Sequence, residues 1–128
     1  MISRDPIDYE RIRKISGSFS WIDHRVLTQG FLKAMSRDEI LLYFLLVLVG
    51  DKNGVSFYGY NKICDLLKIE ADDYLQARNT LIRRRLIAFE KSRFQVLALP
   101  AKQTLVNTPP SRMNGVYSLK EIFKMLSQ

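Results

Sequence analysis

The chain has 128 residues, of which 47% are apolar and 26% are charged, and its formal net charge at pH 7 is +7. This length and composition indicate one soluble globular domain and exclude a disordered chain. A domain of this size buries roughly two thirds of its unfolded surface, so neither a disulfide nor a metal is needed for stability. The single cysteine, Cys64, excludes a disulfide framework and a zinc site built from several cysteines.

Residues 1–35 are expected to form an N-terminal extension that packs on the domain. A short helix near its start would carry an apolar stripe of Ile7, Ile12 and Ile15, and residues 19–22 are strand formers. The region has no apolar segment of the kind that forms the core of a secretory signal. We therefore expect a cytoplasmic protein.

A clearer helix signal begins at Ser36. Ser36 and Glu39 have the spacing of a capping box, in which the serine oxygen accepts the backbone N–H of Glu39 and the glutamate reaches back to the cap. The residues that follow, to about Val49, are apolar almost all round, which indicates a helix in the centre of the domain. Their apolar run, Ile40 to Val49, is shorter than the about 20 residues that cross a bilayer, so we expect no membrane segment.

Shorter elements follow this helix. A strand is predicted at residues 55–57, a short helix at about 61–67 and a third helix at about 70–84. Residues 88–99 then have the pattern of a two-stranded β-hairpin, which Pro100 ends.

The third helix has two different sides when its residues are projected at about 100° per residue. Its apolar, buried side is expected to contain Tyr74, Leu75, Leu81 and Ile82. Arg78 falls within this side and is expected to have a structural role. The opposite side is rich in hydrogen-bonding groups and contains Gln76, Asn79, Thr80 and Arg83.

The predicted domain spans residues 36–100, and residues 101–117 are a predicted linker with few large apolar side chains. Residues 118–128 have the pattern of an amphipathic helix, with an apolar stripe of Leu119, Ile122, Phe123 and Leu126. So short a helix is marginal alone in water, so its stripe must be buried on its own domain, on a second copy or on another protein. Of these, we predict a homodimer to which residues 118–127 contribute.

Most of the excess positive charge lies in one short stretch. Residues 78–93 contain six basic groups and one acidic group, which gives +5 of the total of +7. Clustered charge of this sign favours a polyanionic partner, nucleic acid before membrane. The single histidine, His24, has no nucleophile or metal-ligand pattern to serve, so we expect no enzyme activity, no metal and no cofactor.

The order of elements over about residues 36–99 resembles that of winged helix-turn-helix DNA-binding domains. The resemblance is carried by Leu81, which precedes the pair Leu86 and Ile87 by five residues, and by the strands that follow. It implies an α+β, mainly helical fold with a small antiparallel β-hairpin as the wing. Similar domains occur in bacterial transcription regulators and in replication-initiation or mobile-element proteins of phages and plasmids.

This resemblance implies double-stranded DNA binding by a recognition helix, at about 70–84, and a wing, at 88–99. Amide and guanidinium groups on the outer side of that helix suit base edges. The expected base contacts are Gln76, Asn79, Thr80 and Arg83. The expected phosphate contacts, at the start of the second helix and around the wing, are Tyr60, Asn61, Lys62, Arg84, Lys91 and Arg93.

Two features depart from the family pattern. Arg85 stands where family members often have glycine, so it must adopt the left-handed conformation or the turn must differ. The start of the third helix also carries three carboxylates, Glu70, Asp72 and Asp73, which oppose a phosphate backbone. These carboxylates favour an alternative function, a winged-helix adaptor that binds proteins and makes no direct DNA contact.

Overall fold

The structure is a computed structural model that describes residues 3–101. Its elements, in chain order, are the 3₁₀ helix η1 (Tyr9–Arg11), α1 (Arg25–Thr28), α2 (Phe31–Ala34), α3 (Arg37–Val49), β1 (Val55–Ser56), α4 (Tyr60–Leu67), α5 (Ala71–Arg83), β2 (Ile87–Glu90) and β3 (Arg93–Val96). The predicted linker beyond Ala101, the predicted C-terminal helix at 118–128 and the predicted dimer contact at 118–127 lie outside these residues. Among residues 3–101, no helix combines the length and the apolar character that crossing a bilayer requires.

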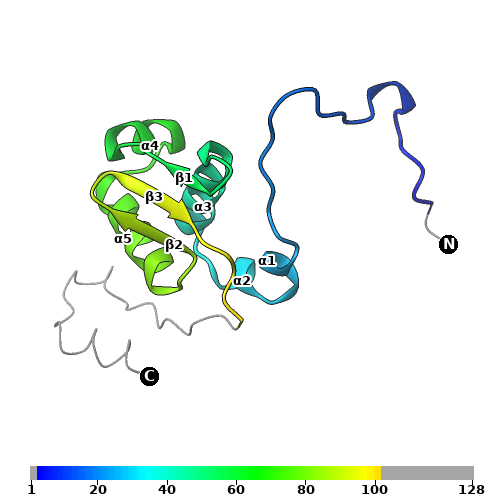
Figure 1. Cartoon of the computed structure of the whole chain (residues 1–128). Helices are drawn as coiled ribbons and strands as arrows, with labels where there is room; N and C mark the ends of the chain where they lie inside the picture. Colours follow the sequence, from blue (N-terminus) through cyan, green and yellow to red (C-terminus); the bar gives the residue numbers. More distant parts are fainter. Residues whose placement is uncertain (1–2, 102–128) are drawn as a thin grey trace.

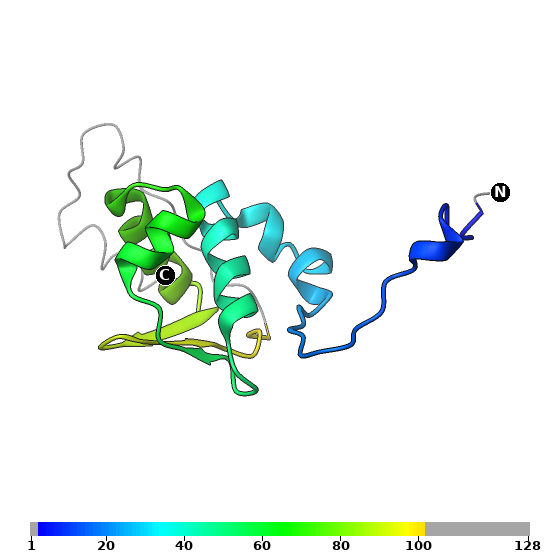
Figure 2. The same cartoon turned by 90° about the horizontal axis from the view of Figure 1, so that it is seen from above.

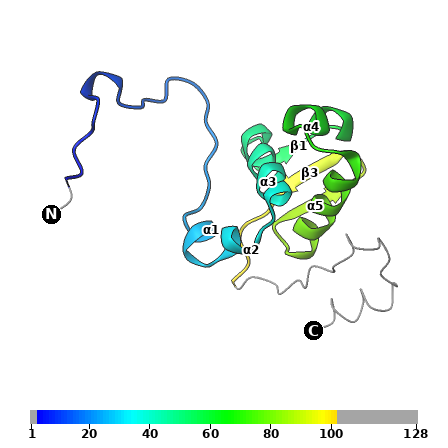
Figure 3. The same cartoon turned by 180° about the vertical axis from the view of Figure 1, so that it is seen from behind.

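The fold is α+β, with helices packed on a small antiparallel sheet. The strand order is β1-β3-β2, and Phe94 of β3 lies opposite Ser56 of β1 and Phe89 of β2. Side chains alternate between the two faces of a strand, so Phe94 and Ile87 are buried while Gln95 is exposed. Figures 2 and 3 show α3, α4 and α5 on the same face of the sheet.

The core lies between α3, α4, α5 and the inner face of the hairpin. Its fully buried large side chains are Phe31, Leu42, Leu46, Ile63, Leu81, Leu86, Ile87 and Phe94. The apolar character of α3 on all sides fits this central position, because α3 contacts α4, α5, β1 and β3. One side of α3 still faces outward, and it exposes Phe44 and Leu48.

Only the second half of the N-terminal region contributes to the core, through Val26, Phe31 and Met35. Every residue from 3 to 19 is exposed, and this segment leads away from the rest of the molecule (Figure 1). Its regular structure is the single turn η1, so the expected stripe of Ile7, Ile12 and Ile15 is exposed and covers nothing. These isoleucines are too few and too widely spaced to form one helix face. Burying them would therefore stabilise a docked segment by less than the conformational entropy that docking costs.

Of the two hydrogen bonds predicted for the capping box at the start of α3, the structure shows the one to the Ser36 side chain. The Ser36 side chain accepts a hydrogen bond from the backbone N–H of Glu39 at 3.2 Å, as expected. The Glu39 carboxylate has a different role from the predicted one, because its Oε1 accepts a hydrogen bond from Arg84 Nε at 3.0 Å. A buried guanidinium is a stronger partner for a carboxylate than a backbone N–H that water can reach.

The end of α5 explains the Leu81–Leu86 spacing. Arg85 has a φ of 63°, the left-handed conformation that sequence analysis gave as one of two alternatives. The Leu86 N–H donates to the Leu81 carbonyl at 3.1 Å, and the Arg85 N–H donates to the Ile82 carbonyl at 3.0 Å. These two bonds form a Schellman motif, which usually brings together the apolar side chains at the positions of Leu81 and Leu86. Both leucines are fully buried, and the chain passes directly into β2.

Candidate nucleic-acid interface

The orientation of α5 differs from the one that hydrophobicity predicts. Its buried residues are Tyr74, Ala77, Thr80 and Leu81. Leu75, which was expected on the buried side, is 42% exposed, and Thr80, which was expected to contact bases, is 2% exposed. The expected base contact at Thr80 is therefore wrong in this structure. The small side chains of Ala77 and Thr80 share a helix face with Arg84, which is bonded to α3, so this face turns inward.

Arg84 is also not available to a phosphate. It is 6% exposed, its Nε donates to Glu39 Oε1 at 3.0 Å, and its Nη2 donates to the Ala34 carbonyl at 3.0 Å. Releasing this guanidinium to DNA would leave the Glu39 carboxylate buried without its partner. The prediction that Arg84 contacts a phosphate is therefore corrected to a structural role.

The other predicted base contacts differ in exposure. Asn79 is exposed, whereas Gln76 and Arg83 are half-buried, and all three side chains already make contacts within the protein. Arg83 Nη2 donates to Thr80 Oγ1 at 3.2 Å, and burial lowers the pKa of the Arg83 guanidinium. Asn79 is thus the most exposed polar side chain of this group.

Arg78 connects α5 to the hairpin. Its guanidinium carbon lies 4.7 Å from the centre of the Phe89 ring on β2 and 5.8 Å from the centre of the Tyr74 ring on α5. Its Nε and Nη2 atoms donate to Asn79 Oδ1 at 3.3 and 3.2 Å. Arg78 was predicted to have a structural role because it falls within the apolar side of α5, and its contact with the Phe89 ring agrees with that role. The contacts of Arg78 place Asn79 next to the hairpin.

The hairpin ends in a two-residue turn that exposes cations. Lys91 has a φ of 58°, and Lys91, Ser92 and Arg93 are all exposed. Arg93 Nη2 lies 4.0 Å from Glu90 Oε2, with side chains 57% and 75% exposed. A pair this exposed contributes little to stability, so Arg93 can change partner at small cost.

The start of α4 also exposes its predicted contacts. Tyr60 is 55% exposed, and Asn61 and Lys62 are exposed. The Lys62 Nζ atom lies 4.6 Å from the centre of the Tyr58 ring, a cation–π contact that holds the ammonium group near the helix N-terminus.

The first turn of α5 has the opposite charge. Asp72 and Asp73 lie in this turn, and Glu70 is the N-cap residue. Two leucines nearby are about half exposed, Leu66 at 51% and Leu75 at 42%. The outer side of α5 therefore changes from acidic and apolar at its start to polar and basic beside the hairpin.

Comparison of the chain with protein-family models, with curated proteins and with solved structures finds no significant match.

Proposed function

We propose that residues 36–100 form a winged helix that binds double-stranded DNA, with α5 in the major groove and the β2–β3 hairpin against neighbouring phosphates. The observation that carries this proposal is the placement of Asn79 beside the hairpin through the contacts of Arg78. This placement puts the Asn79 amide beside β2, the strand that leads into the turn with the exposed cations Lys91 and Arg93.

Two α5 residues would read bases. An asparagine amide can pair with the N6 and N7 atoms of adenine, so Asn79 favours an A·T pair. Leu75, one turn earlier on the same helix face and 42% exposed, suits contact with a thymine methyl group. Gln76 and Arg83 lie beside this pair on α5, and to reach a base Gln76, Arg83 and the Asn79 oxygen would each have to exchange a present contact within the protein.

Phosphates would be held at two places. Lys91 and Arg93 supply charge at the hairpin turn. Tyr60, Asn61 and Lys62 supply hydroxyl, amide and ammonium donors at the start of α4, where backbone N–H groups also point outward. Such contacts position a protein on DNA without reading sequence, as in a transcription regulator or a replication or mobile-element protein.

The acidic start of α5 favours a second candidate, a protein-interaction adaptor. Asp72 and Asp73 would repel phosphates if the helix entered a groove N-terminus first. The same carboxylates, with the half-exposed Leu66 and Leu75, would suit a partner surface that is basic and apolar.

Salt dependence separates the two functions. We expect a gel-shift series on random-sequence duplex DNA to give a log–log slope near −5, since about six phosphates are contacted. The Lys91→Ala/Arg93→Ala variant should make this slope shallower by about two units, whereas Lys33→Ala, an exposed charge change on α2, should leave it unchanged. Absence of binding to any duplex, at low salt, would reject the DNA proposal and leave the adaptor.

A further inference from the structure

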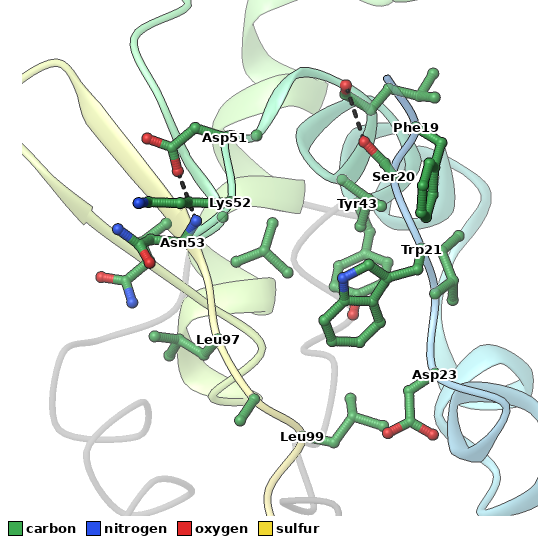
Figure 4. A pocket seen from close by; sticks show the side chains of 18 of the residues that line it. Phe19, Ser20, Trp21, Asp23, Tyr43, Asp51, Lys52, Asn53, Leu97 and Leu99 are labelled. Carbon is green, nitrogen blue, oxygen red and sulfur yellow. Dashed lines mark hydrogen bonds between the residues drawn. The ribbon is translucent and has the colours of Figure 1, made fainter. Parts of the chain in front are cut away.

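A groove on the other side of the molecule is not used by the proposed DNA-binding surface. It has a volume of about 880 Å³ and lies between residues 18–25, the C-terminal half of α3, the loop at residues 50–54 and residues 95–99 (Figure 4). β3 runs from the hairpin turn to this groove, so the two sites lie at opposite ends of the hairpin (Figure 1).

The walls of the groove are mixed, with polar side chains in the loop after α3 and a cluster of large apolar side chains between residues 19–21, α3 and residues 97–99. Trp21 is 74% exposed, Phe19 68% and Leu48 53%, and Leu97 and Leu99 form the facing wall. Figure 4 shows the Trp21 indole and these two leucines bordering the same space. The wall that carries Trp21 is anchored to α3, because Ser20 Oγ donates to the Leu48 carbonyl at 3.3 Å. An exposed cluster of large apolar side chains of this kind is typical of an interaction surface.

The sequence of the chain contains a segment suited to cover it. Residues 118–126 repeat apolar side chains at the spacing of one helix face, with Leu119, Ile122, Phe123 and Leu126. A helix of this length is marginal in water unless its apolar side is buried. The described chain ends at Ala101, two residues after Leu99 in the groove wall. Residues 118–126 are therefore connected to this wall through residues 102–117.

The tether favours docking within one chain. A random-coil chain with the length of residues 101–117 has an r.m.s. end-to-end distance of about 22 Å, enough to return to the groove beside which the described chain ends. Short flexible linkers give effective concentrations in the millimolar range, well above the micromolar concentration of a second copy. We propose that residues 118–126 dock as a helix in the groove of their own domain, with their apolar stripe against Trp21, Leu97 and Leu99.

The single tryptophan makes this proposal directly testable, because Trp21 is both the only tryptophan of the chain and a wall of the groove. In the full chain, we expect blue-shifted Trp21 emission that acrylamide quenches weakly. Ile122→Ser/Phe123→Ser, which removes the centre of the stripe, should shift the emission to the red and raise the quenching constant several-fold. Lys120→Ser/Lys124→Ser changes the same helix outside the stripe and should behave as the unchanged protein.

Two results would overturn the proposal. Equal, high quenching of Trp21 in the unchanged protein and in both variants would show that the groove is open. Shielding that disappears over about a hundredfold dilution would assign the groove to a second copy, because only an intermolecular contact responds to protein concentration. Circular dichroism of each variant distinguishes a loss of folding from a loss of docking. None of these measurements depends on DNA binding.

Discussion

Glu39, in the first turn of α3, and Arg84, directly after α5, form a buried ion pair with 3.0 Å between Oε1 and Nε. The Glu39 and Arg84 side chains are only 5% and 7% exposed. Arg84 also donates to the Ala34 carbonyl at the end of α2. One guanidinium therefore connects the ends of three helices and fixes how α5 is rotated against α3.

We expect Arg84→Ala to lower the free energy of unfolding by about 3–5 kcal/mol, because it leaves the Glu39 carboxylate buried and unpaired. Arg85→Ala removes the same charge from the neighbouring exposed position and should change stability by no more than about 0.5 kcal/mol. Urea unfolding measures both. In the double variant Glu39→Leu/Arg84→Met both charges are absent, so it should recover most of the loss. No recovery would mean that the hydrogen bond to Ala34 is the important contact.

This ion pair is a feature that the sequence alone does not predict. The elements from α3 to β3 were predicted to within a few residues, because caps, apolar periodicity and the Leu81–Leu86 spacing are local signals, whereas α1 and α2 were not predicted as separate helices and the strand formers at 19–22 form no strand. The rotation of α5 depends on a contact between residues 39 and 84, which no local pattern contains. Hydrophobicity alone therefore placed Leu75 inside and Thr80 outside, the reverse of their positions in the structure.

Asn79 and Lys91 test the assigned roles in DNA binding. Asn79→Ala should cost about 1–3 kcal/mol on the preferred site and relax the preference at one base pair, because it would remove the proposed bidentate contact to adenine. Lys91→Ala should weaken binding to all sequences alike and make the salt slope shallower by about one unit. Titrations of a selected site and of random duplex DNA measure both effects. Equal losses of both variants on both DNAs would contradict the division into base and phosphate contacts.

Arg85 offers a stabilising change. Its φ of 63° costs a residue with a side chain roughly 1–2 kcal/mol, a cost that glycine avoids. Glycine also gives the unfolded chain more freedom, so we expect Arg85→Gly to raise stability by no more than about 1 kcal/mol. Ala88→Gly, in the extended strand β2, should instead lower stability by about 0.5–1 kcal/mol. Thermal unfolding compares the two, and destabilisation by Arg85→Gly would mean that the arginine side chain has a role of its own.

Substitutions at Leu46 and Leu66 remove the same side chain from a position inside the core and from one outside it. Leu46 on α3 is fully buried, so Leu46→Ala should cost about 2–5 kcal/mol by removing contacts and leaving a cavity. Leu66 on α4 is 51% exposed, and Leu66→Ala should cost well under half as much. Similar urea midpoints for the two variants would show that α3 is not the centre of the core.

Asp51, in the loop between α3 and β1, makes stability depend on pH. Its Oδ1 accepts hydrogen bonds from the backbone N–H groups of Val55 at 3.0 Å and Asn53 at 2.8 Å, and these bonds hold the pKa of the carboxyl below its ordinary value of 3.8. A carboxyl with a lowered pKa in the folded state contributes stability above its unfolded pKa and loses it as the pH falls through the folded one. Asp51→Ala should therefore be less stable than the unchanged protein at neutral pH, and the difference should shrink below about pH 4. Asp51→Asn keeps an oxygen acceptor without the charge, so it should lie between the two at neutral pH. Urea unfolding from pH 7 to acid follows all three proteins, and a gap between Asp51→Ala and the unchanged protein that stays constant or widens in acid would contradict a role for the charged form.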